Sequence, residues 1–516
     1  MNEIAIGVEA LTEQQVLAVA RHGARVRLSD EARKAISASR DIIESLAGDP
    51  EPHYGISTGF GALATKQIAP ADRTALQRSL IRSHAAGSGA EVEREVVRAL
   101  MLLRLSTLAT GRTGVRLETA ETYAAMLNAG ITPVVYEFGS LGCSGDLAPL
   151  AHCALAAMGE GTVRAGTGRT GGDLLPAADA LAAAGITPIV LREKEGLALT
   201  NGVDGMLGML TLATHDLALL YRTADLAAAM SVEAQLGTDA VFAADLQALR
   251  PHPGQADSAA NLRALLAGSA IMASHRTGDC TRVQDAYSLR CSPQVHGAGR
   301  DTLAHARQVR DRELASAVDN PVVTLDGRVE SNGNFHGAPV GYVLDFLAVA
   351  AADLASIAER RTDRFLDKAR NHGLPPFLAD DPGVDSGYMI AQYTQAALVS
   401  ELKRLAVPAS VDSIPSSAMQ EDHVSMGWSA ARKLRRAVDA LAQVLAIEIL
   451  TAARALDLRA PLTPAPATAA VRDALRQEVA GPGPDRYLAP DIASAVGLVR
   501  SGRLVAAAEA VCGPLN

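Results

Sequence analysis

The sequence is organised around one stretch, GSLGCSGDLAPL, which spans residues 139–150. In it Ser144 stands between two small residues, and an acid and an apolar run of helical composition follow at once. Asp146 occupies the position of an N-cap residue, so its carboxylate is expected to accept hydrogen bonds from amides of the first helical turn. Ser144 then lies just outside a helix N-terminus, where partial positive charge gathers. Spacing alone also fits a simpler interpretation, a glycine-rich cap in front of a packing helix.

The composition predicts a soluble, helical protein. Hydrophobic residues make up 48% of the 516 residues but aromatic residues only 3%, so the core is aliphatic and suited to packed helices. A net charge of −9 argues against a nucleic-acid or membrane-surface partner. The five cysteines form no CxxC pair and no metal-ligand spacing, which predicts a cytoplasmic location and no metal. Neither a signal peptide nor an uninterrupted apolar run of about 20 residues is evident.

Apolar residues at helical spacing predict a long series of helices. Their ranges are 12–20, 30–46, 71–82, 91–110, 116–128, 146–158, 204–230, 342–365, 386–405 and 428–456. The Gly- and Thr-rich segment 159–172 predicts a small hairpin, and strand signals are otherwise few. The predicted fold is therefore mostly α, a long helical bundle with a few short strands. We expect two domains, residues 1–203 with the serine loop and residues 204–516 with the central bundle and the C-terminal helices.

The order of residues around Ser144 resembles the prosthetic-group signature of the histidine and phenylalanine ammonia-lyase family. In that family an Xaa-Ser-Gly tripeptide cyclises to an electrophilic 4-methylidene-imidazol-5-one ring. The resemblance implies that the Gly145 nitrogen attacks the Cys143 carbonyl and that Ser144 loses water. Glycine suits this step because it has no Cβ to hinder the approach of its nitrogen. Many members carry alanine at position 143, and cysteine is expected to be tolerated because only its backbone enters the ring.

Further blocks match the family in the same order along the chain, at residues 54–61, 193–202, 282–291, 319–336 and 416–426. Together they cover nearly the whole chain and imply the long helical bundle of the ammonia-lyase and fumarase-like type. The resemblance implies a catalytic role for Tyr54 as the base, for Ser144 as the source of the electrophile, and for Tyr287. Two positions depart from the family pattern, Thr200 and Val203.

The resemblance also implies a set of substrate-binding residues. These are His84, Asn201, Gln284, Arg290, Phe335, Met389 and Glu421. An arginine fits this role because its guanidinium pairs bidentately with a carboxylate. Each residue type also has a common structural role: arginine and glutamate in salt bridges, histidine in caps, and Asn-Gly pairs in turns.

The implied activity is that of the family's histidine-specific branch, the non-oxidative elimination of ammonia from L-histidine to trans-urocanate. Phenylalanine-type relatives usually carry glutamine where this chain has Glu421, and a carboxylate there is suited to an imidazole N–H. The resemblance further implies no diffusible cofactor and a homotetramer with shared active sites. Long apolar helices agree with the last point, since a monomer would expose large patches. Two alternatives stay open: a sister ammonia-lyase or aminomutase for another aromatic or modified amino acid, and a helical binding protein whose loop is not cyclised.

Overall fold

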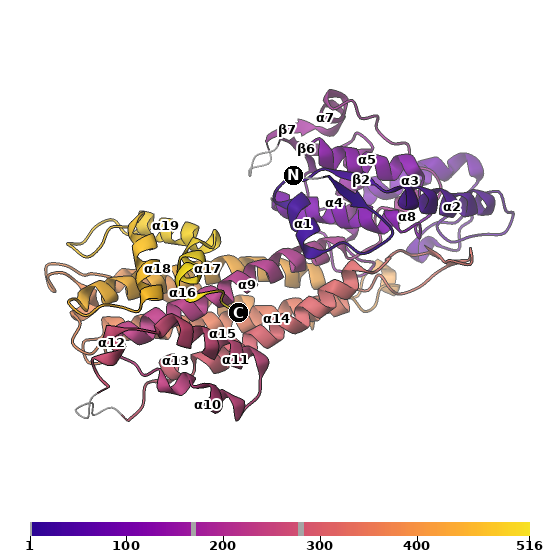
Figure 1. Cartoon of the computed structure of the whole chain (residues 1–516). Coiled ribbons are helices and arrows are strands. Elements are labelled where there is room, and N and C mark those ends of the chain that lie inside the picture. Colours follow the sequence, from indigo (N-terminus) through magenta and orange to yellow (C-terminus); the bar gives the residue numbers. More distant parts are fainter. Residues whose placement is uncertain (1–2, 167–171, 277–282) are drawn as a thin grey trace. The chain divides into compact units, whose positions relative to one another are not determined.

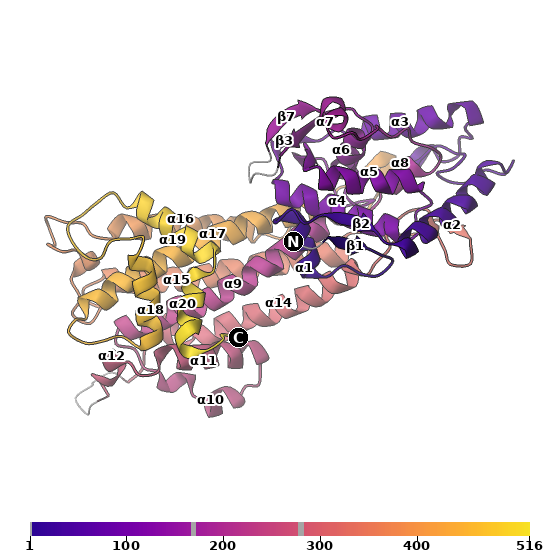
Figure 2. The same cartoon turned by 45° about the horizontal axis from the view of Figure 1, so that its top comes forward.

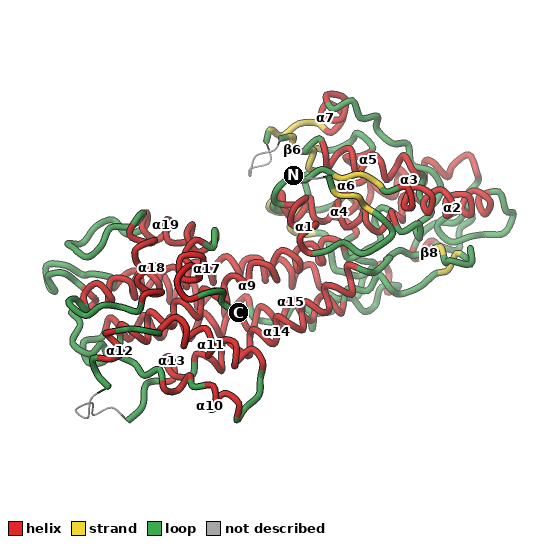
Figure 3. The backbone as a smooth tube through the Cα atoms, viewed as in Figure 1, coloured by secondary structure: helices red, strands yellow, loops and turns green. Residues whose placement is uncertain are grey.

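The computed structural model of this chain describes residues 3–166, 172–276 and 283–516. The chain forms two compact units, which Figure 1 colours by sequence. The first unit comprises Met1–Leu212, Arg307–Asp345 and Pro408–Arg432, and the second comprises Ala213–Ala306, Phe346–Val407 and Lys433–Asn516. Helices dominate the described residues, and the few strands are short (Figure 3), which confirms the mostly α prediction.

The first unit is built around a buried helix, α4 (Arg94–Ala109), in which every residue from Val96 to Ala109 is buried. Most of these residues are apolar, and the buried Arg98 and Arg104 donate to backbone carbonyls, so the helix has no face to offer to water. The neighbouring helices α1, α2, α5 and α6 pack against it. The shorter helices of this unit are α1 (Glu13–Ala20), α2 (Asp30–Ala47), α3 (Arg73–His84), α5 (Leu117–Asn128), α6 (Leu147–Ala157), α7 (Ala177–Ala183) and α8 (Glu195–Ala198).

Short strands cover the edges of this unit. In Figure 2 β1 (Ile4–Ile6) lies beside β2 (Val26–Leu28), and the two are parallel. Of the segment predicted as a hairpin, 159–172, the structure places β6 (Thr162–Ala165) inside the range, and its antiparallel partner β7 (Asp173–Pro176) begins just after it. Residues 167–171 of that segment lie outside the described residues. The remaining strands are β3 (Ser88–Glu91), β4 (Ile131–Pro133), β5 (Tyr136–Phe138), β8 (Val322–Val323) and β9 (Val329–Glu330).

Four long helices contribute residues to both units: α9 (Asp204–Ala234), α14 (Ser292–Leu314), α15 (Ala338–Leu366) and α17 (Gly427–Leu458). Within the second unit buried polar groups join them in pairs. Glu448 accepts from Ser231 at 2.8 Å and pairs with Arg361 at 2.5 Å, while His296 lies 2.7 Å from Asp225. Breaking such a buried pair costs about 3–5 kcal/mol, so these contacts fix which helices are neighbours.

Shorter helices complete the second unit. They are α10 (Ala244–Ala248), α11 (Pro253–Leu266), α12 (Ala270–Ala273), α13 (Tyr287–Arg290), α16 (Met389–Leu405), α18 (Pro466–Arg476), α19 (Ala489–Arg500) and α20 (Arg503–Cys512). Among the described residues one helix, α15, is long and apolar enough to cross a membrane by length and composition. However, 61% of its apolar window is buried within the protein, as in the core helix of a globular domain.

Candidate active site

At Gly145 the backbone of the serine stretch packs directly against the backbone of a second loop, at Gly202. Gly145 has φ +84° and forms an isolated parallel bridge with Gly202. A Cβ atom at position 145 would lie 2.0 Å from the Gly202 carbonyl oxygen, so no side chain fits there. The adjacent Asp146 amide donates to that same oxygen at 2.7 Å. Glycine at position 145 is therefore required by the packing as well as by any ring closure through its nitrogen.

Asp146 corrects one of our predictions. It stands at the N-cap position of α6, but its carboxylate does not accept from the first turn of that helix. Instead, its Oδ2 accepts from the amides of Gly205 and Met206 at 2.9 Å each, in the first turn of α9, and its Oδ1 accepts from the Ser140 hydroxyl at 2.9 Å. The docking of Gly145 on Gly202 brings α9 closer to this carboxylate. Burial raises the pKa of Asp146 to about 7, even though these donors favour its charged form.

The loop that carries Glu421 packs against the serine stretch. The Cys143 side chain is buried in an apolar cluster with Val424 and Met426, which follow Glu421 in that loop. Burial, and then the negative charge of Glu421, raises the pKa of Cys143 to about 12, so the thiol stays protonated at neutral pH. Two loop contacts support this arrangement: Ser425 Oγ donates to the Gly142 carbonyl and the Met426 amide to the Leu141 carbonyl, both at 2.8 Å. The loop that carries Glu421 thus holds the serine stretch on a second side.

His84 is the last residue of α3 and is half-buried. Burial lowers the pKa of its imidazole, while a hydrogen bond to the Leu80 backbone and the charge of Glu421 raise it. Its Nδ1 lies 3.1 Å from the Ser83 hydroxyl. The structure brings together the loops that carry Cys143 and Glu421, two predicted site residues that lie far apart in the sequence.

Tyr54 begins a glycine loop that reaches the same neighbourhood. Its phenol oxygen accepts a hydrogen bond from the Gly61 amide at 3.2 Å, which places a partial positive charge beside the oxygen. The short 3₁₀ turn that starts at Gly61 contacts the turn 417–419, which precedes Glu421. Tyr54 is half-buried, so its side chain is not enclosed in the core as a structural tyrosine would be.

Asn201 is oriented by the block at 319–321. Its Nδ2 donates to the Asn320 carbonyl at 2.8 Å, and no donor to its Oδ1 is seen among the described residues. That oxygen is therefore available to a donor such as an ammonium group. Beneath it Lys194 and Asp319 form a fully buried ion pair at 2.5 Å, and Asp319 also accepts from the Asn320 amide at 2.7 Å.

Phe335 is half-buried in the loop that precedes α15. The next residue, His336, stacks on the ring of His423 with a centroid distance of 5.8 Å and an angle of 3°. His336 Nε2 also lies 3.2 Å from the His423 carbonyl. These contacts bring the Phe335 loop to the Glu421 loop.

The other four predicted site residues belong to the second unit. Tyr287 and Arg290 lie on α13, with the guanidinium carbon 4.7 Å from the centre of the tyrosine ring. If Arg290 served only in a structural salt bridge, its guanidinium would pair with a carboxylate. No such carboxylate partner occurs among the described residues. Met389 is the half-buried first residue of α16. Arg282, which opens this sequence block, lies outside the described residues.

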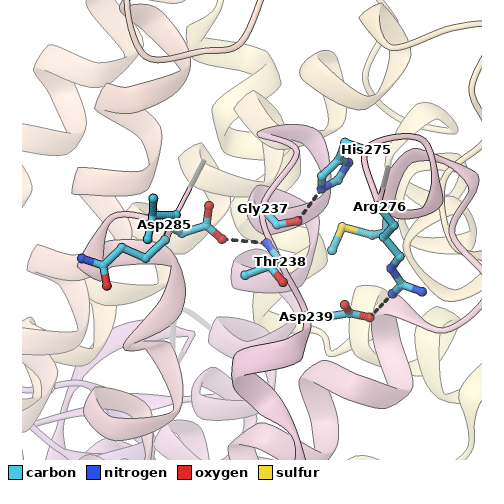
Figure 4. A pocket seen from close by; sticks show the side chains of 9 residues that line it. Gly237, Thr238, Asp239, His275, Arg276 and Asp285 are labelled. Atoms are coloured by element: carbon cyan, nitrogen blue, oxygen red, sulfur yellow. Dashed lines mark hydrogen bonds and ion pairs between the residues drawn. The ribbon is translucent and has the colours of Figure 1, made fainter. Parts of the chain in front are cut away.

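Gln284 lines a pocket of about 200 Å³ within the second unit (Figure 4). The other polar groups of this pocket are paired with one another: Asp285 accepts from the Thr238 amide at 2.6 Å, and Arg276 pairs with Asp239 at 2.5 Å. His275 Nε2 lies 2.8 Å from the Gly237 carbonyl. Gln284 is exposed, so its amide is the group of this wall that remains available for a new partner.

The chain belongs to the aromatic amino acid lyase family, whose model matches residues 11–477, and it is a carbon–nitrogen lyase. Histidine ammonia-lyases from Streptomyces avermitilis and Streptomyces coelicolor are each 67% identical to it, over 100% of both chains. A solved histidine ammonia-lyase from Trypanosoma cruzi is 37% identical, with a TM-score of 0.90, over 99% of this chain and 96% of that chain. A tyrosine aminomutase from Streptomyces globisporus is 38% identical, with a TM-score of 0.92, over 99% of each chain. These structures confirm the predicted fold type.

Several residues that build the site were missed from the sequence. Ser416, which contacts Glu421, and the Lys194–Asp319 pair give no signal by spacing, because their partners are brought together only by folding. Gly202 was read as part of an Asn-Gly turn. Its pairing with Gly145 could have been suspected only from two glycines in two blocks that were both expected at the site.

Proposed function

We propose that this chain catalyses the non-oxidative elimination of ammonia from L-histidine, which gives trans-urocanate. The observation that carries the proposal is the Glu421 carboxylate, which accepts from Ser416 Oγ at 3.0 Å in the loop that packs against the serine stretch. This polar, charged wall beside the serine tripeptide is suited to an imidazole and unsuited to a phenyl ring. The full-length relatives named histidine ammonia-lyase support the same substrate.

We further propose that Cys143, Ser144 and Gly145 carry a 4-methylidene-imidazol-5-one group formed from their own atoms, with no diffusible cofactor. The residues present fit this group. Position 145 admits only glycine, and the Cys143 side chain packs with Val424 and Met426, so no side chain obstructs a ring made of backbone atoms. The group would supply an electrophile that turns the substrate amine into a better leaving group.

Three residues act on the carboxylate, the ammonium group and the β-proton of the substrate in the proposed reaction. Arg290 pairs with the substrate carboxylate, because its guanidinium has no carboxylate partner among the described residues. Asn201 accepts from the substrate ammonium through its unpaired Oδ1. Tyr54 takes the β-proton as general base, with the Gly61 amide positioned to stabilise the phenolate oxygen.

The other residues line the substrate. Tyr287 stacks under Arg290 and limits the directions that the guanidinium can take. Gln284 offers a further amide, and Phe335 and Met389 offer half-buried apolar walls. Thioether side chains adapt to the shape of a ligand, which suits a wall that meets a planar ring.

We expect Glu421→Gln to lower kcat/KM for histidine by at least ~10-fold, which is roughly 1.4 kcal/mol. The reason is the loss of a charge-assisted hydrogen bond to an imidazole N–H, worth on the order of 1.5–3 kcal/mol. The melting temperature should change little, because glutamine keeps the shape of the side chain. Urocanate absorbance measures the rate. A variant as active as wild type would remove Glu421 from the substrate site and reopen the choice of substrate.

A second candidate is an aminomutase or lyase for another aromatic amino acid, which the similarity to a tyrosine aminomutase favours. The two candidates differ in product. Histidine that yields urocanate supports the first, whereas tyrosine or phenylalanine that yields a β-amino acid or a cinnamate supports the second.

We propose that the enzyme is a cytoplasmic homotetramer with active sites shared between subunits. The described cysteines are all free thiols, which supports a reducing compartment. Apolar side chains on two helices of the second unit are half-exposed or more, and they would be covered in an oligomer: Val349 on α15 is 49% exposed, and Ile390 and Tyr393 on α16 are each 59% exposed.

Sharing of sites has a direct test. Tyr54→Phe and Arg290→Ala should each be nearly inactive alone. When the two variants are co-expressed, random assembly should restore about a quarter of the sites, if each site takes these residues from different subunits. The matched control co-expresses the wild-type chain with a chain that carries both changes. This mixture contains the same total amount of intact Tyr54 and Arg290 side chains, so its activity is the reference for the mixture of single variants. Activity no higher than the sum of the separate variants would contradict shared sites, as would an active monomer in light scattering.

A further inference from the structure

The turn that leads into Glu421 has an uncommon backbone. Ser417, Ala418 and Met419 have φ values of +51°, +52° and +68°, and none of them is glycine. Side chains in the left-handed region crowd the backbone, so three such residues in a row persist only where other contacts hold them. All three are exposed, so packing in a core does not hold them there.

Hydrogen bonds between Ser416 and Glu421 close this turn. The Ser416 amide donates to the Glu421 carbonyl at 3.0 Å, and the Glu421 amide donates to the Ser416 carbonyl at 3.3 Å. The two residues thus form an isolated antiparallel bridge across the turn. These main-chain bonds suffice to close the turn, and they do not depend on the side chain at position 416.

The Ser416 hydroxyl makes a separate contact. Its Oγ donates to Oε2 of Glu421 at 3.0 Å. An ionised carboxylate has about four acceptor sites, so acceptor capacity remains for a substrate N–H.

We propose that Ser416 is a positioning residue that holds the Glu421 carboxylate in the orientation in which it accepts a hydrogen bond from the substrate imidazole. This inference rests on the proposed function, because it needs Glu421 in the substrate site. A glutamate side chain has three rotatable bonds, and one that is half-buried must otherwise be ordered when the substrate binds. The rigid turn fixes the glutamate backbone, and the serine hydroxyl fixes its far end, so that ordering precedes binding.

The test uses the full-length enzyme with histidine as substrate. Ser416→Ala should lower kcat/KM by about 10- to 150-fold, the range expected for a lost hydrogen bond to a charged group, with the melting temperature close to that of wild type. Ser416→Thr keeps the hydroxyl and should restore most of the activity, since threonine suits the extended backbone at 416 (φ −140°, ψ −179°). Ser417→Ala is the matched control, a serine in the same turn with an exposed side chain, and should behave as wild type.

A double-mutant cycle with Glu421→Gln separates positioning from a general effect on the loop. If Ser416 acts through Glu421, the double variant should be within about twofold of Glu421→Gln alone. Three outcomes would each overturn the inference and leave the proposed function standing. The losses of the two single variants could multiply in the double variant, Ser416→Ala could be as active as wild type, or Ser416→Thr could be as poor as Ser416→Ala. Glu421→Gln with unchanged histidine turnover would overturn both, so the two failures are distinguished.

Discussion

Replacement of Ser144 by alanine is expected to give a folded protein with almost no turnover. Alanine has no hydroxyl to lose as water, so the proposed methylidene cannot form. The loss in kcat should be at least about a thousandfold, which is modest beside the 10⁶-fold or greater accelerations of enzymes. The fold should survive, because the Ser144 side chain is half-buried and makes no hydrogen bond among the described residues.

Intact-mass measurement is the direct check on this prediction. The wild-type chain should be lighter than its sequence by two water molecules, and Ser144→Ala should have the full mass of its sequence. Cys143→Ala is the matched control: it should cyclise and keep most of its activity, because only the backbone of residue 143 would enter the ring. Wild-type turnover by Ser144→Ala would end the proposal of a self-formed prosthetic group.

Tyr54→Phe is expected to lower kcat by about 10²- to 10⁴-fold, the usual contribution of a general base. Phenylalanine fills the same space, and the Gly61 amide that donated to the phenol lies at an exposed residue where water can replace it. The melting temperature should therefore stay close to that of wild type.

Tyr136→Phe provides the comparison for this variant. Tyr136 is also half-buried in the first unit, where its ring packs edge-on against His152 with a centroid distance of 5.2 Å. It has no role in the proposed reaction, so its variant should keep wild-type kcat. If Tyr54→Phe also keeps wild-type kcat, another group removes the β-proton.

Periodicity located ten of the helices, among them the long α9, α15 and α17, but it did not predict the fourth long helix, α14. Its sequence is polar and includes Gly297 and Gly299, which favour turns over helix. In the structure these glycines are sites of close packing: a Cβ at Gly297 would lie 2.3 Å from the Gln255 amide nitrogen, and one at Gly299 would lie 2.1 Å from the Tyr221 hydroxyl. Tertiary contacts outweighed local propensity there, and no pattern within the segment itself reveals them.

The candidate site, like the helices, could be predicted only in part from the sequence. The blocks that resemble a family brought Tyr54, Ser144 and Glu421 into one hypothesis, and the structure places their loops in contact within the first unit. The partner of the Asp146 carboxylate was predicted wrongly, because the amides of its own helix were the only ones that the local sequence could offer. The left-handed turn before Glu421 was not expected either, since no glycine marks it.

The buried Lys194–Asp319 pair has a consequence for attempts to widen the substrate range of this enzyme. Its two residues are fully buried and have no task in the proposed reaction, yet the Asp319 carboxylate accepts from the Asn320 amide, and the Asn320 carbonyl in turn accepts from Asn201. Mutant libraries that randomise the wall around Asn201 will include neighbours of this pair. A substitution that leaves one of these two charges buried without its partner lowers the free energy of unfolding by about 3–5 kcal/mol, enough to unfold many marginally stable proteins. Clones lost in that way would score as catalytically dead, so activity screens of this wall need a parallel measure of folded protein.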